Sequence, residues 1–411
     1  MSDNATMKNT TIHDMTTGSP ARLIMQFMIP MFLGNIFQQF YNIADSIIAG
    51  QFLGVRALAA IGSTGSLMFF VTGWLNGLSS GFAILVSQWF GAKEYERMRH
   101  YVAMSIYLSA GWAVLMTIGL GIANEPILRL MNYKDSIMPD VKAYMGIIYA
   151  GLIVTAAYNA LAAFLRALGD SKSPLYFLII SAVINVGLDV AFIIYGGMGV
   201  EGCAYATVIA QGISVVLCFI YIVKKFPILH LKKENFRFSL PACGKLMALG
   251  VPMALQFSIT AIGTIIVQGA VNVYGEDYMA GFSAAAKIQN VICTVFVAFG
   301  ATIATYVGQN WGAGKVDRVR QGVRCTQIMI LAYSVIAMIL VFFFSKYLTY
   351  LFISHQRRKL LKYQCCISIQ YSGVIHSWEV SSYIGIPCKD LDMDLCRCSE
   401  ECLNLRRDLQ L

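Results

Sequence analysis

The sequence predicts an all-α protein that crosses a membrane several times. Of its 411 residues, 57% are hydrophobic and only 13% are charged, and the mean hydropathy is +0.63. A soluble domain carries about 25% charged residues, so these values exclude that class. Several apolar runs exceed the roughly 20 residues that cross the hydrocarbon core of a bilayer. The runs do not alternate apolar and polar residues, which excludes the strands of a membrane β-barrel.

Length and polarity divide the chain into nine predicted membrane-spanning segments. They cover 23–50, 57–89, 100–123, 141–165, 174–197, 200–223, 246–274, 278–310 and 325–353. The loops after the even-numbered segments are rich in Lys and Arg, as between Lys224 and Arg237. The positive-inside rule places these loops and the polar tail of residues 1–22 in the cytoplasm. The net charge of +9 therefore reflects topology, and we expect no nucleic-acid partner.

A sequence repeat relates the second predicted segment to the eighth. SQWFGAKEYERMR begins at Ser87, and GQNWGAGKVDRVR begins at Gly308, 221 positions later and without a gap. In the same way, the first segment opens with IPM at Ile29 and the seventh with VPM at Val251. The members of each pair are six segments apart, an even number, so the two halves have the same orientation and are parallel repeats of a transporter type. Three glycines also give the second segment a small-residue face for helix packing: Gly73, Gly77 and Gly81.

The second half of the repeat is shorter than the first, because the hydrophobic pattern stops near Ser354. We expect a complete six-helix N-lobe over 23–225, a basic cytosolic loop over 226–245 and a three-helix C-lobe over 246–353. The remaining stretch, 354–411, holds six of the 11 cysteines, without the paired spacing of a zinc finger. The genetic code permits codons for residues 383–397 that, read one base out of step, encode YRNSLQGLGYGLVP. That sequence resembles the end of the fourth segment. We therefore expect residues 354–411 to be the product of a shifted reading frame.

Two acidic residues lie deep inside apolar segments. Asp45 shares a helix face with Gln38, and Asp189 shares one with Asn185. A carboxylate in hydrocarbon costs several kcal/mol, so both acids are expected to face a protein interior or a wet cavity. One interpretation is a pair of satisfied core acids; the other is an ion or proton site of a transporter.

The sixth segment adds Thr207 and Gln211, which share a helix face. A rise of 1.5 Å per residue places Asp45, Asp189 and Thr207 in the outer half of the N-lobe. Two carboxylates, an amide oxygen from Asn185 and a hydroxyl form a set of hard oxygen ligands that suits Na⁺. Alternatively, the two acids form a proton site.

The chain resembles the multidrug and toxic compound extrusion (MATE) transporters. The matching sequence motifs are the run from Pro30 to Asp45, VSQWFGA, RALGDSKSP and NVGLD. The resemblance covers roughly residues 20–350. It implies a two-lobe helix bundle of two six-helix halves. The chain is similar to the DinF-like branch, which holds its coupling cation or proton in the first lobe. The other branches use an acid in the seventh segment, where this chain has Gln256 and no carboxylate.

The resemblance implies specific roles for residues of the first lobe. Cation or proton coupling is implied for Gln38, Asp45, Asn185, Asp189 and Thr207. Na⁺ would be held by Asp45, Asn185, Asp189 and Thr207. Pro30 would be the hinge of the first helix.

The resemblance implies a multidrug efflux antiporter that exports organic, mostly cationic, compounds in exchange for Na⁺ or H⁺. We expect a monomeric, multi-pass protein of the bacterial inner membrane with a cytoplasmic N-terminus and no cofactor. Its partners are then small-molecule drugs or metabolites and the lipid bilayer. No phosphate-binding loop or nucleophile constellation indicates an enzyme.

Two alternatives remain open. A chain that lacks most of a lobe would be an inactive, truncated remnant of such a transporter. The other alternative is a lipid-linked oligosaccharide flippase of the same superfamily. A flippase needs several Lys or Arg residues around its anionic cargo, whereas Lys287 is the one cation deep inside a predicted span.

Overall fold

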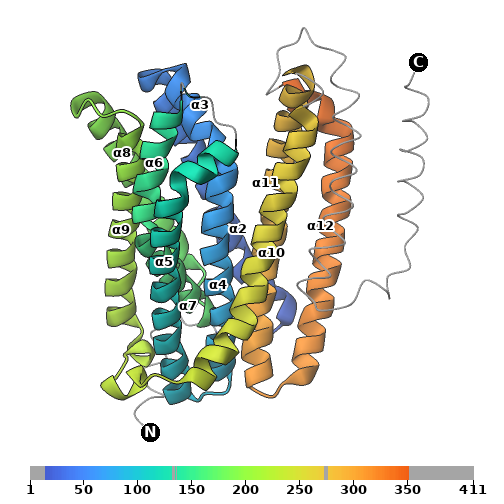
Figure 1. The fold of residues 1–411 in the computed structure, drawn as a ribbon. Helices are drawn as coiled ribbons and strands as arrows, with labels where there is room; N and C mark the ends of the chain where they lie inside the picture. The colour runs from blue at the N-terminus through green and yellow to red at the C-terminus, as the bar shows by residue number, and fades with distance from the viewer. Residues whose placement is uncertain (1–13, 132–134, 136, 273–275, 351–411) are drawn as a thin grey trace. The chain divides into compact units, whose positions relative to one another are not determined.

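The computed structural model describes residues 14–131, 135, 137–272 and 276–350. All regular structure in these ranges is helical, with no strand, which confirms the predicted all-α class. The expected out-of-frame tail at 354–411 and the first 13 residues lie outside the described ranges. Figure 1 shows the helices coloured from blue near the N-terminus to red near the C-terminus.

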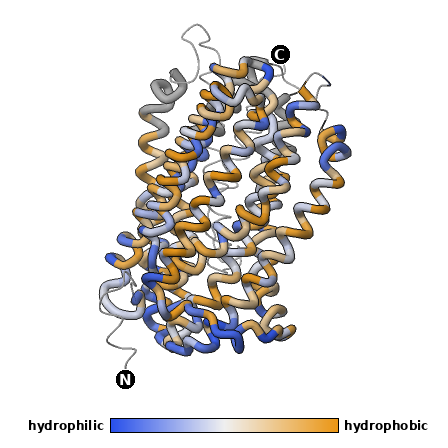
Figure 2. Tube along the Cα trace, turned by 90° about the vertical axis from the view of Figure 1, so that its left-hand side faces the viewer, coloured by the Kyte–Doolittle hydropathy of each residue, from blue (hydrophilic) through white to orange (hydrophobic). Residues whose placement is uncertain are grey.

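Each predicted segment overlaps one helix or a pair of helices. The long helices are α2 (Pro20–Ile48), α4 (Gly65–Gly91), α5 (Tyr95–Leu130), α8 (Lys172–Val190), α9 (Val200–Lys225), α10 (Leu240–Asn272), α11 (Glu276–Gly312) and α12 (Val316–Tyr350). The shorter ones are α3 (Val55–Ser63), α6 (Met138–Ala150) and α7 (Leu152–Ala167). Eight helical spans in the described ranges are long and apolar enough to cross a membrane, and a bent pair makes up to nine. In Figure 2 the helices are largely hydrophobic, and hydrophilic residues gather at their ends.

The fourth predicted segment is the bent pair. It breaks into α6 and α7 at Gly151, with a bend of 48°. A Cβ at Gly151 would collide with the side chain of Val208 on α9, so glycine allows the close approach at this bend. Two later segments also begin well before the predicted residue: α10 begins at Leu240, six residues before 246, and α12 begins at Val316, nine residues before 325.

Two of the helices end in a π-helical turn. α2 continues into a π-helix at Ala49–Leu53, and α8 continues into one at Ala191–Tyr195. The two π-helical turns pack against each other. Such turns are rare and are often found at functional sites.

Contacts divide the chain into two compact units. One combines Met1–Gly269 with Ala301–Cys325, and the other combines Ala270–Gly300 with Thr326–Leu411. In the first unit α8 packs on α9 and α2, while α7 packs on α4, α5 and α9. In the second unit the ring of Phe296 packs edge-on against Tyr333, 5.2 Å between centroids.

The predicted small-residue face of α4 is a helix-packing surface. The Cβ of an alanine at Gly77 would lie 2.5 Å from the Cα of Ala254 on α10. At Gly81 it would lie 2.5 Å from the Cα of Gly250. The α4 and α10 backbones therefore touch along this face, as the glycine spacing predicts.

Candidate functional site

The two buried acids lie together between α2 and α8. Asp189 is 0% exposed and Asp45 is 9% exposed. The two carboxyl groups lie close enough to interact electrostatically. Each acid directly precedes the π-helical turn of its own helix, four residues ahead in α2 and two in α8. The sequence places both acids at comparable depth, and helix packing turns them toward each other.

Thr207 holds two polar side chains beside the acid pair. Its hydroxyl oxygen accepts hydrogen bonds from Tyr41 OH at 3.1 Å and from Nδ2 of Asn185 at 3.4 Å. Tyr41 also interacts electrostatically with the Asp45 carboxyl group. Because the Thr207 oxygen already accepts two hydrogen bonds, Thr207 positions Asn185 and Tyr41 in this arrangement.

Several oxygen atoms of this cluster accept no hydrogen bond from the described residues. They are Oδ1 of Asp45, both carboxylate oxygens of Asp189 and Oδ1 of Asn185. Buried oxygens without donors are expensive, because the lost hydration is not replaced. Four such acceptors in one buried cluster form a site that a cation or a proton would stabilise.

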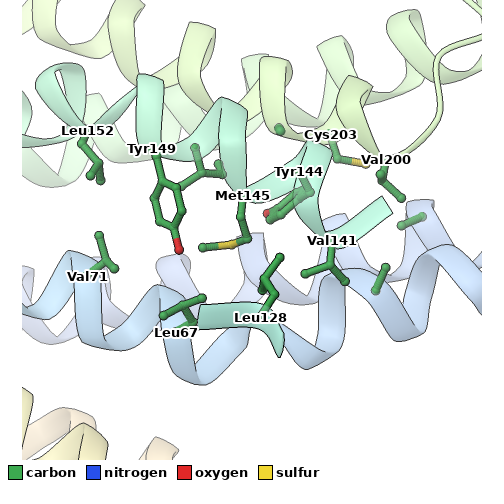
Figure 3. Close-up of a cluster of buried hydrophobic side chains, with 14 of the residues drawn as sticks. Leu67, Val71, Leu128, Val141, Tyr144, Met145, Tyr149, Leu152, Val200 and Cys203 are labelled. Atoms are coloured by element: carbon green, nitrogen blue, oxygen red, sulfur yellow. The ribbon is translucent and has the colours of Figure 1, made fainter. Parts of the chain in front are cut away.

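An apolar cluster lies next to the acids, and two of its members, Tyr144 and Cys203, are their neighbours. Figure 3 shows part of it, with Tyr144, Met145 and Tyr149 from α6 beside Leu128 and Cys203. Tyr144 interacts electrostatically with both acids. Low polarity strengthens every electrostatic interaction in the site. It also makes an uncompensated pair of carboxylates costly.

The remaining predicted site residues do not join this hydrogen-bonded cluster. Gln38 lies on an exposed part of α2, and Pro30 is buried within the same helix, whose helical run is unbroken there. Lys287 belongs to α11, but its side chain lies outside the described ones.

Sequence reasoning missed Tyr144 and Cys203 as neighbours of the acids. The polar residue at helical spacing from Tyr144 is Asp140, which pairs with Arg56 instead, and Cys203 reads as a small apolar residue. No signal in the sequence gives the rotation of α6 and α9 that brings both next to the pair.

The MatE family model matches residues 30–191 and 252–365, the two parts that the repeat relates. The chain belongs to the MATE family. This MATE protein is 30% identical over 352 residues to the "Probable multidrug resistance protein YpnP" of Bacillus subtilis, covering 83% of this chain and 76% of the relative. It is 28% identical to "Probable multidrug resistance protein YoeA" of the same organism, covering 82% and 74%.

Solved structures share the fold of this MATE protein. A MOP-superfamily transporter from Pyrococcus furiosus superposes with a TM-score of 0.82 at 21% identity, covering 92% of this chain and 85% of that one. An outward-facing multidrug resistance MATE transporter superposes with the same score at 20% identity and the same coverage. The MATE-like helical fold predicted from the sequence is confirmed.

Groups of three or more His, Cys, Asp or Glu side chains that could hold a metal ion do not occur in the described part of the chain. The acid pair therefore has only two charged ligands, one from α2 and one from α8. Such a set, with neutral oxygens beside it, suits a monovalent cation or a shared proton better than a tightly held divalent metal.

Proposed function

We propose that this MATE protein is a multidrug exporter of the bacterial inner membrane that is driven by the inward movement of Na⁺ or H⁺. The observation that carries the proposal is the Asp45–Asp189 pair, buried on two different helices beside oxygens without donors. The multidrug-resistance names of its relatives support an organic cargo.

The pair acts as a charge switch. Two adjacent carboxylates in a dry site repel each other, and a cation or proton between them removes this repulsion. Binding therefore draws α2 and α8 together at the two acids, and loss of the cation favours their separation. The adjoining π-helical turns lie where such a movement would be taken up.

Coupling to drug export requires only that cation and drug prefer different conformations of the protein. The cation favours the state in which the acids lie together. If the drug favours the other state, each ligand weakens the binding of the other by the same factor. Alternate occupancy then drives an exchange of drug for cation.

The test measures transport of an organic cation, ethidium, in proteoliposomes with an imposed Na⁺ or pH gradient. Asp45→Asn and Asp189→Asn should each reduce gradient-driven transport at least tenfold while membrane insertion is kept. Asp140→Asn is the matched control, because Asp140 is a surface acid paired with Arg56 at 2.8 Å. Wild-type export by Asp45→Asn under both gradients would remove the acid pair from the mechanism.

A further inference from the structure

A row of polar side chains continues inside the first unit beyond the acid pair. The buried residues of α8 are Ser173, Pro174, Ser181, Asn185 and Asp189, whereas Val183 on the opposite face is 69% exposed. The helix therefore turns its apolar residues outward and its polar residues into the protein. In a membrane protein this arrangement marks a polar interior and not simple core packing.

The α9 helix carries a matching row. Thr207, Gln211, Ser214, Cys218 and Tyr221 follow one another at alternating spacings of four and three, which places them on one helix face. From Thr207 to Tyr221 the row extends about 21 Å along the helix axis. It starts at the acid pair and ends on the side that the basic loops assign to the cytoplasm.

Hydrogen bonds connect the two rows with α7. Below Thr207, Thr155 Oγ1 donates to Oε1 of Gln211 at 2.7 Å. One turn further, Ser214 Oγ donates to the carbonyl oxygen of Phe177 at 3.1 Å. At the end of the row, Tyr221 OH donates to Oδ2 of Asp170 at 3.4 Å. Polar groups of α7, α8 and α9 thus meet between Thr207 and Ser214. Further along the row, Cys218 and Tyr221 pack in an apolar cluster with Phe226.

We propose that Thr155, Ser181, Gln211 and Ser214 form the route by which the coupling cation, Na⁺ or a proton, leaves the acid pair toward the cytoplasmic side. The inference rests on the proposed function. Hydroxyl and amide oxygens can replace the hydration of a passing Na⁺, and with intervening water they can pass a proton. Beyond these residues, the Asp170 carboxylate is 2% exposed and accepts hydrogen bonds from Ser173 and Tyr221.

Two nearly isosteric variants, Gln211→Met and Thr155→Val, test the route in proteoliposomes. Each should slow Na⁺ or H⁺ flux at least tenfold, while the stabilisation of the purified protein by Na⁺ or by acid stays at the wild-type level. That retained response also shows that the variant is folded. Tyr205→Phe is the control, because Tyr205 lies on the exposed face of α9 at 44% exposure.

The outcomes separate the route from the site. If Asp189→Asn abolishes flux and Gln211→Met leaves it at the wild-type level, the route is wrong and the proposed function stands. If Gln211→Met also abolishes the response to the cation, Gln211 belongs to the binding site and the route is again wrong. If neither Asp189→Asn nor Gln211→Met changes flux, the proposed function itself fails.

A second, independent observation concerns the segment just before α2. Met15 is 1% exposed, and its backbone N–H donates to Oε1 of Gln309 at 3.0 Å. Lys315 donates to the carbonyl oxygen of Thr16 at 2.9 Å, and Arg318 donates to that of Gly18 at 2.9 Å. Residues 14–18, here called the strap, are thus fastened to the end of α11 and the start of α12.

One residue, Gln309, joins the strap to the end of α7. Gln309 holds the strap through its Oε1 atom and donates from Nε2 to the carbonyl oxygen of Ala167, at the end of α7, at 2.8 Å. Any conformational change that separates the ends of α7 and α11 must break this double contact.

Of the two repeat stretches, only the one that begins at Gly308 binds the strap through its arginine in the described part of the chain. In the first motif, Arg97 pairs with Glu94 at 2.9 Å and lies over the ring of Trp89. The equivalent Arg318 binds Oδ1 of Asn310 and the strap carbonyls instead. We infer that the strap stabilises the conformation in which the predicted cytoplasmic ends of α7 and α11 are together.

Spin labels at Lys172, exposed just beyond the end of α7, and at Asp317, exposed just beyond the end of α11, test the strap by distance measurement in a background without native cysteines. Met15→Ala and Arg318→Gln should each increase the population with the longer label distance several-fold. Thr17→Ala, at an exposed strap position, should match the wild type. Wild-type distance distributions for both Met15→Ala and Arg318→Gln would overturn the inference.

Discussion

Gly91 at the end of α4 lies directly against the backbone carbonyl of Gln309 near the end of α11. The contact is reciprocal, because Gly312 lies in the same way against the carbonyl of Gln88. These residues occupy equivalent positions of the sequence repeat. The motif that relates the two halves is therefore also the surface on which the two helix ends meet.

The first prediction concerns this crossing. A Cβ at position 91 would overlap the carbonyl oxygen of Gln309, and backbone on both sides leaves no flexible group to move. Gly91→Ala should destabilise this conformation by about 1–3 kcal/mol, the usual cost of overpacking. Thermal unfolding of the purified protein measures the effect. Gly111→Ala is the control, because a Cβ there meets no atom within 4 Å.

The second prediction concerns the bend between α6 and α7. Gly151→Ala should destabilise the protein by about 1–3 kcal/mol, because the added methyl group collides with the Val208 side chain. Since the obstacle is a side chain, Val208→Ala should restore much of that loss in the double variant. Equal stability of the single and double variants would show that the contact with α9 does not fix the bend.

The third prediction concerns the α4–α10 seam. Gly81→Ala should loosen this seam, because its Cβ would lie 2.5 Å from the Cα of Gly250 and 2.7 Å from the carbonyl oxygen of Leu249. We expect a lower yield of folded protein and a loss of about 1–3 kcal/mol in stability. Size-exclusion profiles and thermal unfolding provide the measurement. The same change at Gly119, which has open space around it, should be silent.

The fourth prediction concerns the organisation of the cation site. Thr207→Val keeps the shape of the side chain but removes the acceptor for Tyr41 and Asn185. Two weakened hydrogen bonds correspond to about 1–2 kcal/mol, or roughly five- to thirty-fold weaker cation binding. Thr207→Ser retains the hydroxyl and should bind nearly as the wild type does. Cation-dependent stabilisation of the purified variants checks both, and equal affinities for Val and Ser would contradict the role of the hydroxyl.

The sequence by itself determined the all-α membrane class, the positions of the helices and the repeat. These features depend on local quantities: the cost of transferring each residue into hydrocarbon and the 3.6-residue period of the helix. The same quantities singled out Asp45 and Asp189, because a carboxylate within an apolar run is expensive wherever the helix goes.

Only the tertiary structure decided which faces meet. It brought Asp45 to Asp189, placed Tyr144 beside them and left Gln38 outside the hydrogen-bonded cluster. It also fastened Met15 to Gln309, nearly 300 residues away in the chain. Helical periodicity fixes the relative directions of residues on one helix, but not the rotation of that helix about its axis. That rotation is set by packing against neighbours, through contacts such as those of the glycine faces, which no single segment contains.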